Sequence, residues 1–546
     1  MVSPNDTHEV FNQSPPFAGL NLFTTDPALG ALVEGLPQSV VAEIAEHGGQ
    51  LGTPETFELG RIANASPPNL RNFDATGTRI DSVEFHPAYH ALMRRSVASG
   101  LHCSAWDASG DEAPVRAVAR AARLYMTAQV EAGHICPMTM TNASVAALAH
   151  TQSLADTWLP RIRTRRYDSA QRPLAAKAGA LIGMGMTEKQ GGSDVGSNTT
   201  AAVEAGDGLW RITGHKWFLS APASDAFLML AQANDGLSCF LVPRYLPDGS
   251  LNGLRLMRLK DKLGNRSNAT AEVEIDSAGG WLVGEAGRGV ATIIDMVTLT
   301  RLDCAVASAG MMRLALAEAV HHCRYRKVSG APLVDQPLMT RVLADMALDA
   351  VAAAALSLRL AESFDRAADS PAEAAFARLM TPAVKYWVTK VASPMIGEAM
   401  ECLGGNGYIE ESHLPRLYRE APVNSIWEGA GNVMALDVLR VMRKSSEPLE
   451  SVLANVEDAL GSTAKSTLNV LRAATAVALA DEGSARILTE QLAMTVAAAA
   501  LRRRFPSVVA DAFLETRLGK PWRSTYGMLD SRFDARAFVN YLCPVD

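Results

Sequence analysis

Residues 184–194 read MGMTEKQGGSD and mark the point where the sequence changes character. Up to about residue 180, apolar residues recur every three or four positions, which is typical of amphipathic helices. From about residue 181 to residue 290, short alternating runs are separated by Gly, Asn and Asp, which predicts strands and turns. No long helical segment separates these runs, so we expect an antiparallel sheet.

Helical periodicity returns after this β-rich region and continues to about residue 444. A polar stretch at 444–451 predicts a linker, and an alanine-rich helical segment follows. The sequence therefore predicts a mainly α protein with a central antiparallel β domain, divided into residues 1–180, 181–290, 291–444 and 445–546. The clearest expected elements are helices at 115–133, 143–158, 304–326, 339–364 and 372–405, and strands at 209–220, 226–233 and 238–243.

The composition is that of a packed globular protein, with 48% hydrophobic and 20% charged residues. A formal net charge of −7 argues against nucleic-acid binding by the chain as a whole. The seven cysteines form no C-x-x-C pair, which predicts neither a zinc site nor a disulfide framework and fits a reducing cytoplasm. The N-terminus lacks a secretory signal, and no stretch approaches the ~20 apolar residues of a membrane span. We therefore expect a cytoplasmic protein without a metal site or membrane contact.

The quoted stretch itself is open to two interpretations. Its adjacent glycines leave backbone N–H groups accessible to a ligand, and Thr187 and Ser193 add hydroxyls. It is not a phosphate-binding P-loop, because no GK[ST] follows the glycines. It could equally be a tight surface turn. The run GHKWFLS at 214–220 presents a similar choice: its aromatic residues could cover a flat ring system, with Ser220 donating to it, or they could be ordinary strand core.

A lone acid, Glu428, lies in the stretch NSIWEGAGN at 424–432, with no cation within four residues on either side. Ser425-x-x-Glu428 has the spacing of a helix capping box. The alternative is a general base, kept among apolar groups so that it can take a proton from a substrate. Two further stretches, at 326–337 and 401–411, could contact an anion or could simply end helices.

In this order and at these distances, the five stretches resemble the acyl-CoA dehydrogenase family over about residues 80–444. The resemblance implies an α/β/α fold, FAD as cofactor, an acyl-CoA substrate and a homotetramer built from dimers. It also implies that Glu428 is the catalytic base, because the position of the base in a minority of the family is occupied here by Thr300. The cofactor-binding residues that it implies are Met184, Met186, Thr187, Gly192, Ser193, Phe218, Ser220, Arg326, Gln336, Gly404, Gly405, Ala430 and Asn432. Of these, Arg326 and Gln336 are expected to reach the FAD of a neighbouring subunit.

The N-terminal lead at 10–29 and the stretches at 59–70 and 259–269 resemble a branch of this family, the AidB-type proteins of the bacterial response to DNA alkylation. This likeness implies weak dehydrogenase activity on short branched acyl-CoAs such as isovaleryl-CoA. It also implies non-specific binding of double-stranded DNA through a C-terminal helical domain. Residues 440–546 carry 14 Lys+Arg against 12 Asp+Glu, a balance of +2, which suits phosphate contacts but is also ordinary for a solvated surface. The candidate DNA-binding residues are Arg440, Arg443, Lys444, Arg502, Arg503, Arg504, Arg517, Lys520 and Arg523.

Two other functions stay open at this point. A metabolic acyl-CoA dehydrogenase with no DNA role would have its flavin rapidly reduced by some acyl-CoA. In a purely structural tetramer, FAD would be a folding ligand only, and replacement of Glu428 by Gln would leave every phenotype unchanged.

Overall fold

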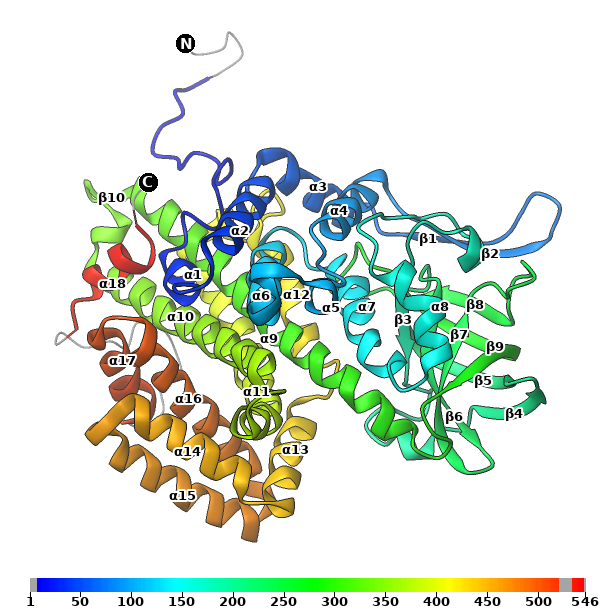
Figure 1. Ribbon diagram of the computed structural model, residues 1–546. Coiled ribbons are helices and arrows are strands. Elements are labelled where there is room, and N and C mark those ends of the chain that lie inside the picture. The colour runs from blue at the N-terminus through cyan, green and yellow to red at the C-terminus, as the bar shows by residue number, and fades with distance from the viewer. Residues whose placement is uncertain (1–6, 520–532, 545–546) are drawn as a thin grey trace.

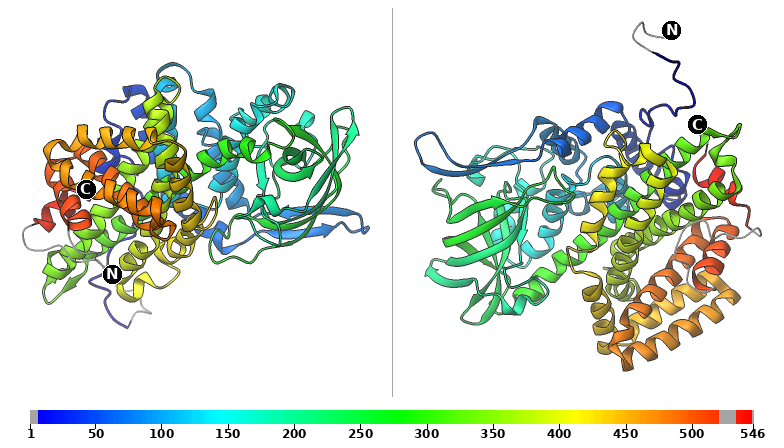
Figure 2. Two further views of the ribbon diagram at one scale, coloured as in Figure 1. Left: turned by 90° about the horizontal axis from the view of Figure 1, so that it is seen from below. Right: turned by 180° about the vertical axis from the view of Figure 1, so that it is seen from behind.

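The structure is a computed structural model that describes residues 7–519 and 533–544. Helices dominate, and one large β-sheet lies at one end of the molecule, as both the front view (Figure 1) and the view from behind (Figure 2) show. The C-terminal helices lie at the opposite end from this sheet. The predicted fold class, mainly α with a central β domain, is confirmed.

The N-terminal region is helical as predicted, but it also contains an antiparallel hairpin of β1 (Asn69–Phe73) and β2 (Arg79–Glu84), which the periodicity does not predict. The single helix predicted at 143–158 is wrong, because the chain breaks into two helices around Thr151. The Thr151 hydroxyl there accepts a hydrogen bond from the Gly284 N–H at 2.8 Å. The helices are α1 (Pro27–Leu32), α2 (Gln38–Leu51), α3 (Pro54–Ala65), α4 (Pro87–Ala98), α5 (Ser104–Asp107), α6 (Arg116–Val130), α7 (Ile135–Leu148) and α8 (Gln152–Ile162).

The central sheet has seven strands in the order β3-β5-β4-β6-β7-β9-β8. Most of its pairings are antiparallel as predicted, but β3 and β4 both run parallel to β6. Because β5 pairs with β9 as well as with β4, the sheet curls back on itself. Its strands are β3 (Ile182–Gly185), β4 (Ala201–Gly206), β5 (Leu209–Ser220), β6 (Ala226–Ala233), β7 (Gly236–Pro243), β8 (Leu254–Leu259) and β9 (Thr270–Val283).

Long helices follow the sheet, and the longest, α9, has 37 residues, so that it spans about 55 Å. The linker predicted at 444–451 is wrong, because α14 begins only three residues after α13 ends. Pro448 in its first turn and Glu447 and Glu450 at its N-terminus favour a helix start there. These helices are α9 (Gly289–Tyr325), α10 (Pro337–Arg366), α11 (Pro371–Cys402), α12 (Leu414–Asn424), α13 (Gly431–Lys444), α14 (Glu447–Leu460), α15 (Ala464–Ala480), α16 (Ala485–Arg504), α17 (Ser507–Phe513) and α18 (Ala535–Leu542).

One apolar core joins the helical regions. Buried residues from α2, α6, α9, α10, α11 and the C-terminal helices α14 to α18 belong to the same cluster. A second cluster lies between α7, α8 and the sheet. The C-terminal helices are therefore packed into the body of the protein and are not an appended, independent module.

The end of α9 contacts segments from both extremes of the chain. Arg326, directly after α9, donates from Nη1 to the Asn12 carbonyl at 2.6 Å, and Asn12 Oδ1 accepts from the Lys327 N–H at 2.7 Å. Arg324 donates to the Pro544 carbonyl at 2.8 Å. These contacts fix the short hairpin of β10 (Lys327–Val328) and β11 (Ala331–Pro332), which lies at the far end of α9 from the sheet (Figure 1).

Candidate active site

Two of the predicted stretches lie side by side on neighbouring strands. Met184 on β3 is the register partner of Ser220 on β5, and the Thr187 carbonyl accepts from the Trp217 N–H at 2.8 Å. Phe218, on the same strand, is 46% exposed. The structure thus assembles one surface from methionine thioethers, hydroxyls and an aromatic ring.

The loop after β3 is held by a buried ion pair that the sequence analysis missed. The Glu188 carboxylate accepts from Lys216 Nζ at 2.7 Å and from the Thr199 N–H at 2.7 Å, with both charged side chains fully buried. Burial opposes ionisation, but these donors hold the pKa of Glu188 well below its usual value. The only sequence signal was a lysine inside an apolar strand.

Gly192 has no room for a side chain, since a Cβ would lie 2.4 Å from Thr187 Oγ1. The threonine hydroxyl and the glycine backbone are therefore packed together in the loop. This close approach explains why the second glycine of the pair is a glycine, without excluding a ligand on the outer side of the loop.

Glu428 lies in the loop between α12 and α13. Its neighbour Trp427 packs against the same apolar cluster as Met184 and Met186. The capping-box interpretation is wrong, because Ser425 donates its hydroxyl to the Pro422 carbonyl and α13 begins only at Gly431, with Ala430 as its N-cap. Glu428 adopts a φ of 56°, which is rare for a residue with a side chain.

The Glu428 carboxylate has the electrostatics of a base. Thr300 Oγ1 on α9 donates to Oε2 at 2.7 Å and is the one side chain in the described parts of the chain that donates to this carboxylate. Burial raises the pKa of Glu428, while the Thr300 hydrogen bond and the charges of Arg301 and Lys385 act in the opposite direction and leave a net increase. A carboxylate with a raised pKa is better matched to proton abstraction near neutral pH.

The two cations beside Glu428 contact its backbone and were not predicted as site residues. Arg301 Nε donates to the Glu428 carbonyl at 3.0 Å. Lys385 Nζ, from α11, donates to the Trp427 carbonyl at 2.8 Å and also to the Gly429 carbonyl. For Lys385, the available signal was a single charge in the apolar run AVKYWV.

Four of the predicted cofactor residues lie elsewhere. Arg326 is 25 positions beyond Arg301, which corresponds to about 40 Å of helix. Gln336 precedes α10, which begins where α9 ends. Because α11 runs antiparallel to α10, its C-terminal end returns to the same place, and Gly404 and Gly405 follow it there. These three residues therefore lie at the same end of α9 as Arg326. A Cβ at either glycine would meet no atom within 4 Å, so their backbone is open to a ligand. One chain therefore does not bring this group to Glu428.

Ala430 and Asn432 follow Glu428 directly. Ala430 is exposed at the N-cap of α13. The exposed Asn432 accepts from Arg486 Nε on α16 at 2.7 Å. The stretch that carries the candidate base is thus in contact with the C-terminal helices.

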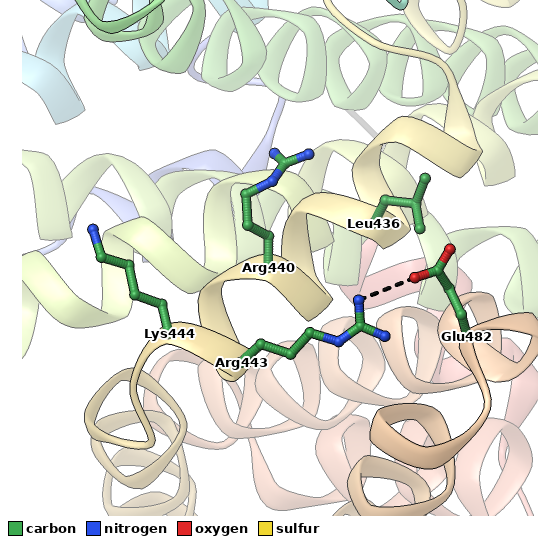
Figure 3. Close-up of a pocket in the computed structure, with 5 residues that line it drawn as sticks. All are labelled: Leu436, Arg440, Arg443, Lys444 and Glu482. Carbon is green, nitrogen blue, oxygen red and sulfur yellow. Dashed lines mark hydrogen bonds and ion pairs between the residues drawn. The ribbon is translucent and has the colours of Figure 1, made fainter.

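Three of the candidate DNA-binding residues gather around a surface hollow of about 490 Å³, lined by Leu436, Arg440, Arg443, Lys444 and Glu482 (Figure 3). Arg443 pairs with Glu482 at 3.0 Å. Arg440 has a 71% exposed side chain and contacts Asp437 at 3.1 Å. Lys444 is exposed and has no carboxylate partner among residues 7–519 and 533–544. We call this group the α13 basic cluster, defined as Arg440, Arg443 and Lys444.

Four of the other candidate DNA-binding residues are engaged by acids. Arg502 pairs with Asp511, Arg503 with Asp458 at 2.9 Å and Arg504 with Glu362 at 2.6 Å. Arg517 is only 4% exposed and contacts Asp345 at 2.6 Å and Asp349 at 3.0 Å, so its prediction as a phosphate contact is wrong for this arrangement. Lys520 and Arg523 lie outside the residues that the structure describes.

The predicted absences concern the described residues only. No helix there is long and apolar enough to cross a membrane. The same residues contain no group of three or more His, Cys, Asp or Glu side chains able to hold a metal ion. The seven cysteines are all free and buried.

Comparisons with known proteins agree with this geometry. Three family descriptions match the chain in order: "Adaptive response protein AidB N-terminal domain" at residues 12–169, "Acyl-CoA dehydrogenase, middle domain" at 183–278, and "Acyl-CoA dehydrogenase, C-terminal domain" at 287–443. AidB of Escherichia coli (strain K12), named as an acyl-CoA dehydrogenase, is 52% identical over 445 residues, which cover 81% of each chain. The chain belongs to the acyl-CoA dehydrogenase family.

Other relatives extend the likeness beyond the matched domains. Acyl-CoA dehydrogenase family member 11 of Caenorhabditis elegans is 35% identical over 477 residues, covering 83% of this chain and 75% of that protein. The crystal structure of ACDH-11 from Caenorhabditis elegans in complex with C11-CoA has a TM-score of 0.82 at 30% identity and covers 100% of this chain and 94% of that one. The C-terminal helices are therefore part of the shared architecture.

As an acyl-CoA dehydrogenase family member, the chain is an FAD-dependent dehydrogenase. Its residues fit the cofactor. The β3–β5 surface offers hydroxyls, and Gly191, Gly404 and Gly405 offer backbone with no atom where a side chain would lie. Hydroxyls and open peptide N–H groups suit a ligand that has a flat ring at one end and phosphates at the other.

Proposed function

We propose that the protein oxidises an acyl-CoA thioester between its α and β carbons, with Glu428 as the base that removes the α-proton. The supporting observation is a carboxylate with a raised pKa, hydrogen-bonded by Thr300, whose neighbour Trp427 packs against the same apolar cluster as Met184 and Met186. A base must lie within hydrogen-bonding reach of the proton that it takes. The acid of the β3 loop, Glu188, is instead held ionised in its pair with Lys216.

FAD, when bound, supplies the acceptor for the hydride that leaves the β carbon. The protein residues do the remaining work. We assign the cofactor-side surface to Met184, Met186, Thr187, Gly192, Ser193, Phe218 and Ser220. Trp427 is an apolar neighbour of the base in the chain and packs against the same cluster as the two methionines. Thr300 holds one carboxylate oxygen, Oε2, and leaves Oε1 to accept the proton. Ala430 and Asn432 remain candidate cofactor contacts at the start of α13.

For the acyl group we propose short branched chains such as the isovaleryl group, on the strength of the likeness to AidB. ACDH-11, by contrast, was crystallised with C11-CoA. A comparison of anaerobic flavin bleaching by isovaleryl-CoA and by C11-CoA tests this choice. Faster bleaching by the longer substrate would overturn it.

The base assignment is tested with Glu428→Gln. We expect FAD to stay bound while acyl-CoA-driven flavin bleaching falls by about 10²- to 10⁴-fold, the usual worth of a general base. Glu285→Gln, which changes an exposed acid at the edge of the β domain, is the matched control and should bleach at the normal rate. Normal bleaching in Glu428→Gln would remove Glu428 from the mechanism, and loss of FAD would count against its role as a base.

We also propose that the protein binds double-stranded DNA without sequence preference, as part of a response to DNA alkylation, through the α13 basic cluster. The observation that favours this site is the gathering of Arg440, Arg443 and Lys444 around one exposed hollow (Figure 3). Phosphate contacts of this kind carry no sequence information. Arg502, Arg503 and Arg504 are weaker candidates, because their side chains are less exposed than those of Arg440 and Arg443.

DNA binding is tested by titrating a fluorescent duplex at several salt concentrations. Removal of the C-terminal helices is unsuitable, because they share the main core. We instead expect Arg440→Ala/Lys444→Ala to weaken binding and to make the salt slope shallower by about 1 for each phosphate that is no longer neutralised. Arg211→Ala, which removes one exposed charge from β5, should change neither. An unchanged salt slope in the double variant would refute DNA binding through the α13 basic cluster. The assignment to the acyl-CoA dehydrogenase family would not be affected.

Finally, we propose a homotetramer in which Arg326, Gln336, Gly404 and Gly405 complete the FAD site of a second copy. The separation of about 40 Å of helix between Arg301 and Arg326 supports this, because one chain does not bring both sets together. Arg326→Ala should weaken FAD binding without altering Glu428. A monomeric mass by light scattering, with FAD fully bound, would refute the assembly.

A further inference from the structure

The peptide groups around Glu428 are held in an unusual way. Glu428 has a φ of 56° and the following Gly429 a φ of 101°, so two consecutive residues lie in the left-handed region. Glycine adopts this conformation freely, but a residue with a Cβ does so only when the surrounding structure imposes it. A specific set of contacts must therefore keep Glu428 there.

Three consecutive carbonyls, at positions 427, 428 and 429, each accept a hydrogen bond from a cation. Arg301 Nε takes the central one at 3.0 Å. Lys385 Nζ takes the two flanking ones, at 2.8 Å to Trp427 and at shorter range to Gly429. Because a single ammonium bridges the carbonyls before and after Glu428, it fixes the direction in which that residue's side chain leaves the backbone.

Lys385 is not placed there to form an ion pair. It is 1% exposed on the core helix α11, and in the described parts of the chain no carboxylate lies within ion-pair distance of its Nζ. Burying a charge is costly unless strong acceptors surround it, and an apolar residue would fill this position at a lower cost. The two carbonyls of the Glu428 stretch accept hydrogen bonds from the ammonium and so offset the cost of its burial.

We propose that Lys385 is a positioning residue for the catalytic base: its ammonium bridges the Trp427 and Gly429 carbonyls and thereby aims the Glu428 carboxylate at the substrate. This inference rests on the proposed role of Glu428 as the base. Arg301 assists from the other side, and its second contact, with Asp437 at 2.8 Å, ties the stretch to α13.

The charge of Lys385 adds an electrostatic effect. Its ammonium lowers the pKa of Glu428, against the larger effect of burial. Burial in turn lowers the pKa of Lys385 to about 8. The titratable and charged groups that face it are Cys304 and Arg301 from α9, Glu428 from the loop and Lys390 from α11. Removal of the ammonium should therefore raise the pKa of Glu428.

The test uses full-length, FAD-loaded Lys385→Met, with Lys465→Met as the control, because Lys465 is exposed on α15. We expect Lys385→Met to keep FAD and to show at least tenfold faster amide hydrogen exchange in a peptide covering 424–432. Flavin bleaching by isovaleryl-CoA should fall by about 10²-fold, the cost of a misplacement near 1 Å. The acidic limb of its pH profile should move to higher pH. Lys465→Met should match the wild type in all four readouts.

Lys385→Arg keeps a charged donor and should recover part of the exchange protection and the normal acidic limb. An FAD-loaded Lys385→Met with unchanged exchange and an unchanged limb would overturn the proposal. If that variant fails to fold, Lys385→Gln and Lys385→Arg decide by the same two readouts. Failure of the base assignment is distinguished by Glu428→Gln: if it bleaches normally, Glu428 is not the base, whereas the exchange rates still report on Lys385.

Discussion

The charges that surround a stretch in the sequence differ from those that surround it in the fold, both at Glu428 and in the basic runs of the C-terminal helices. At Glu428 the fold adds cations, whereas in the C-terminal helices it adds acids. Glu428 has no cation within four residues in the sequence, yet Arg301 and Lys385 contact its peptide groups. Arg502, Arg503 and Arg504 form a run of three cations, yet each is paired with an acid. Local charge therefore indicates little about the field at a site, because folding brings opposite charges together from distant positions.

The sharpest test of this contrast is Arg517, which looks like a DNA contact in the sequence and is buried against Asp345 and Asp349. Arg517→Met should lower the free energy of unfolding by about 3–5 kcal/mol, because it leaves two buried carboxylates without this guanidinium. Arg440→Met, at an exposed position, should leave the melting temperature nearly unchanged. Equal melting temperatures for the two variants would refute the structural role.

The next prediction concerns the free energy of unfolding, which the buried Glu428 carboxylate lowers when it is ionised. The folded pKa of Glu428 is raised above its unfolded value, so the folded state binds the proton more tightly and the protein loses stability as pH rises through this range. Each unit of pKa shift corresponds to about 1.4 kcal/mol. Glu428→Gln should thus melt higher than the wild type at pH 7, and the difference should vanish below about pH 4. A lower melting temperature at pH 7 would contradict this sign; Glu285→Gln is the control.

A smaller change is expected at Thr300. Thr300→Val removes the one side-chain donor to the Glu428 carboxylate, so the pKa of Glu428 should rise. The acidic limb of the flavin-bleaching profile should move upward by about one pH unit, the worth of a hydrogen bond to a charged group. Thr298→Val is the matched control, since its hydroxyl donates only to the Ile294 carbonyl of its own helix. An unmoved limb would mean that Thr300 does not tune the base.

The smallest effect is expected at Arg503, whose partner Asp458 is 80% exposed. Arg503→Ala should change the free energy of unfolding by no more than about 1 kcal/mol, as surface pairs do. It should also leave the salt slope of duplex binding unchanged. A slope that becomes shallower by about 1 would show that Arg503 contacts phosphate despite its pairing.

Local pattern was enough to predict many elements. The strands at 209–220 and 226–233 agree with β5 and β6, because the first mixes β-branched and aromatic residues with polar ones, the second is a continuous apolar run, and both are bounded by turns. The break at Thr151 is harder to see, because apolar periodicity continues across it; the available signal was a threonine at the N-cap of α8. The polar residues at 444–451 belong to the start of a helix and not to a linker. Pro448 and Glu450, both typical of a first helical turn, are the sequence signals for this start.

The site divides in the same way. Met184 and Ser220 come from two stretches that the sequence singles out, and the structure makes them register partners. The role of Glu428, inferred from a combination of stretches in a fixed order, stays a prediction. Lys385 and Glu188 were not, because each acts on peptide groups or partners far away in the sequence. Arg517 was misassigned for the same reason: its partners on α10 are more than 160 positions away.

The end of α9 has a consequence for the order in which the protein is made. Arg326 is held by Asn12 and Arg324 by Pro544, so the hairpin that presents Arg326 depends on both early and late residues. During synthesis, N-terminal parts fold first as the chain leaves the ribosome. The contact with Pro544 forms only after this residue, 220 positions beyond Arg324, has emerged. Nascent chains can therefore assemble the sheet early, whereas this far end of α9 is completed only once Pro544 is available.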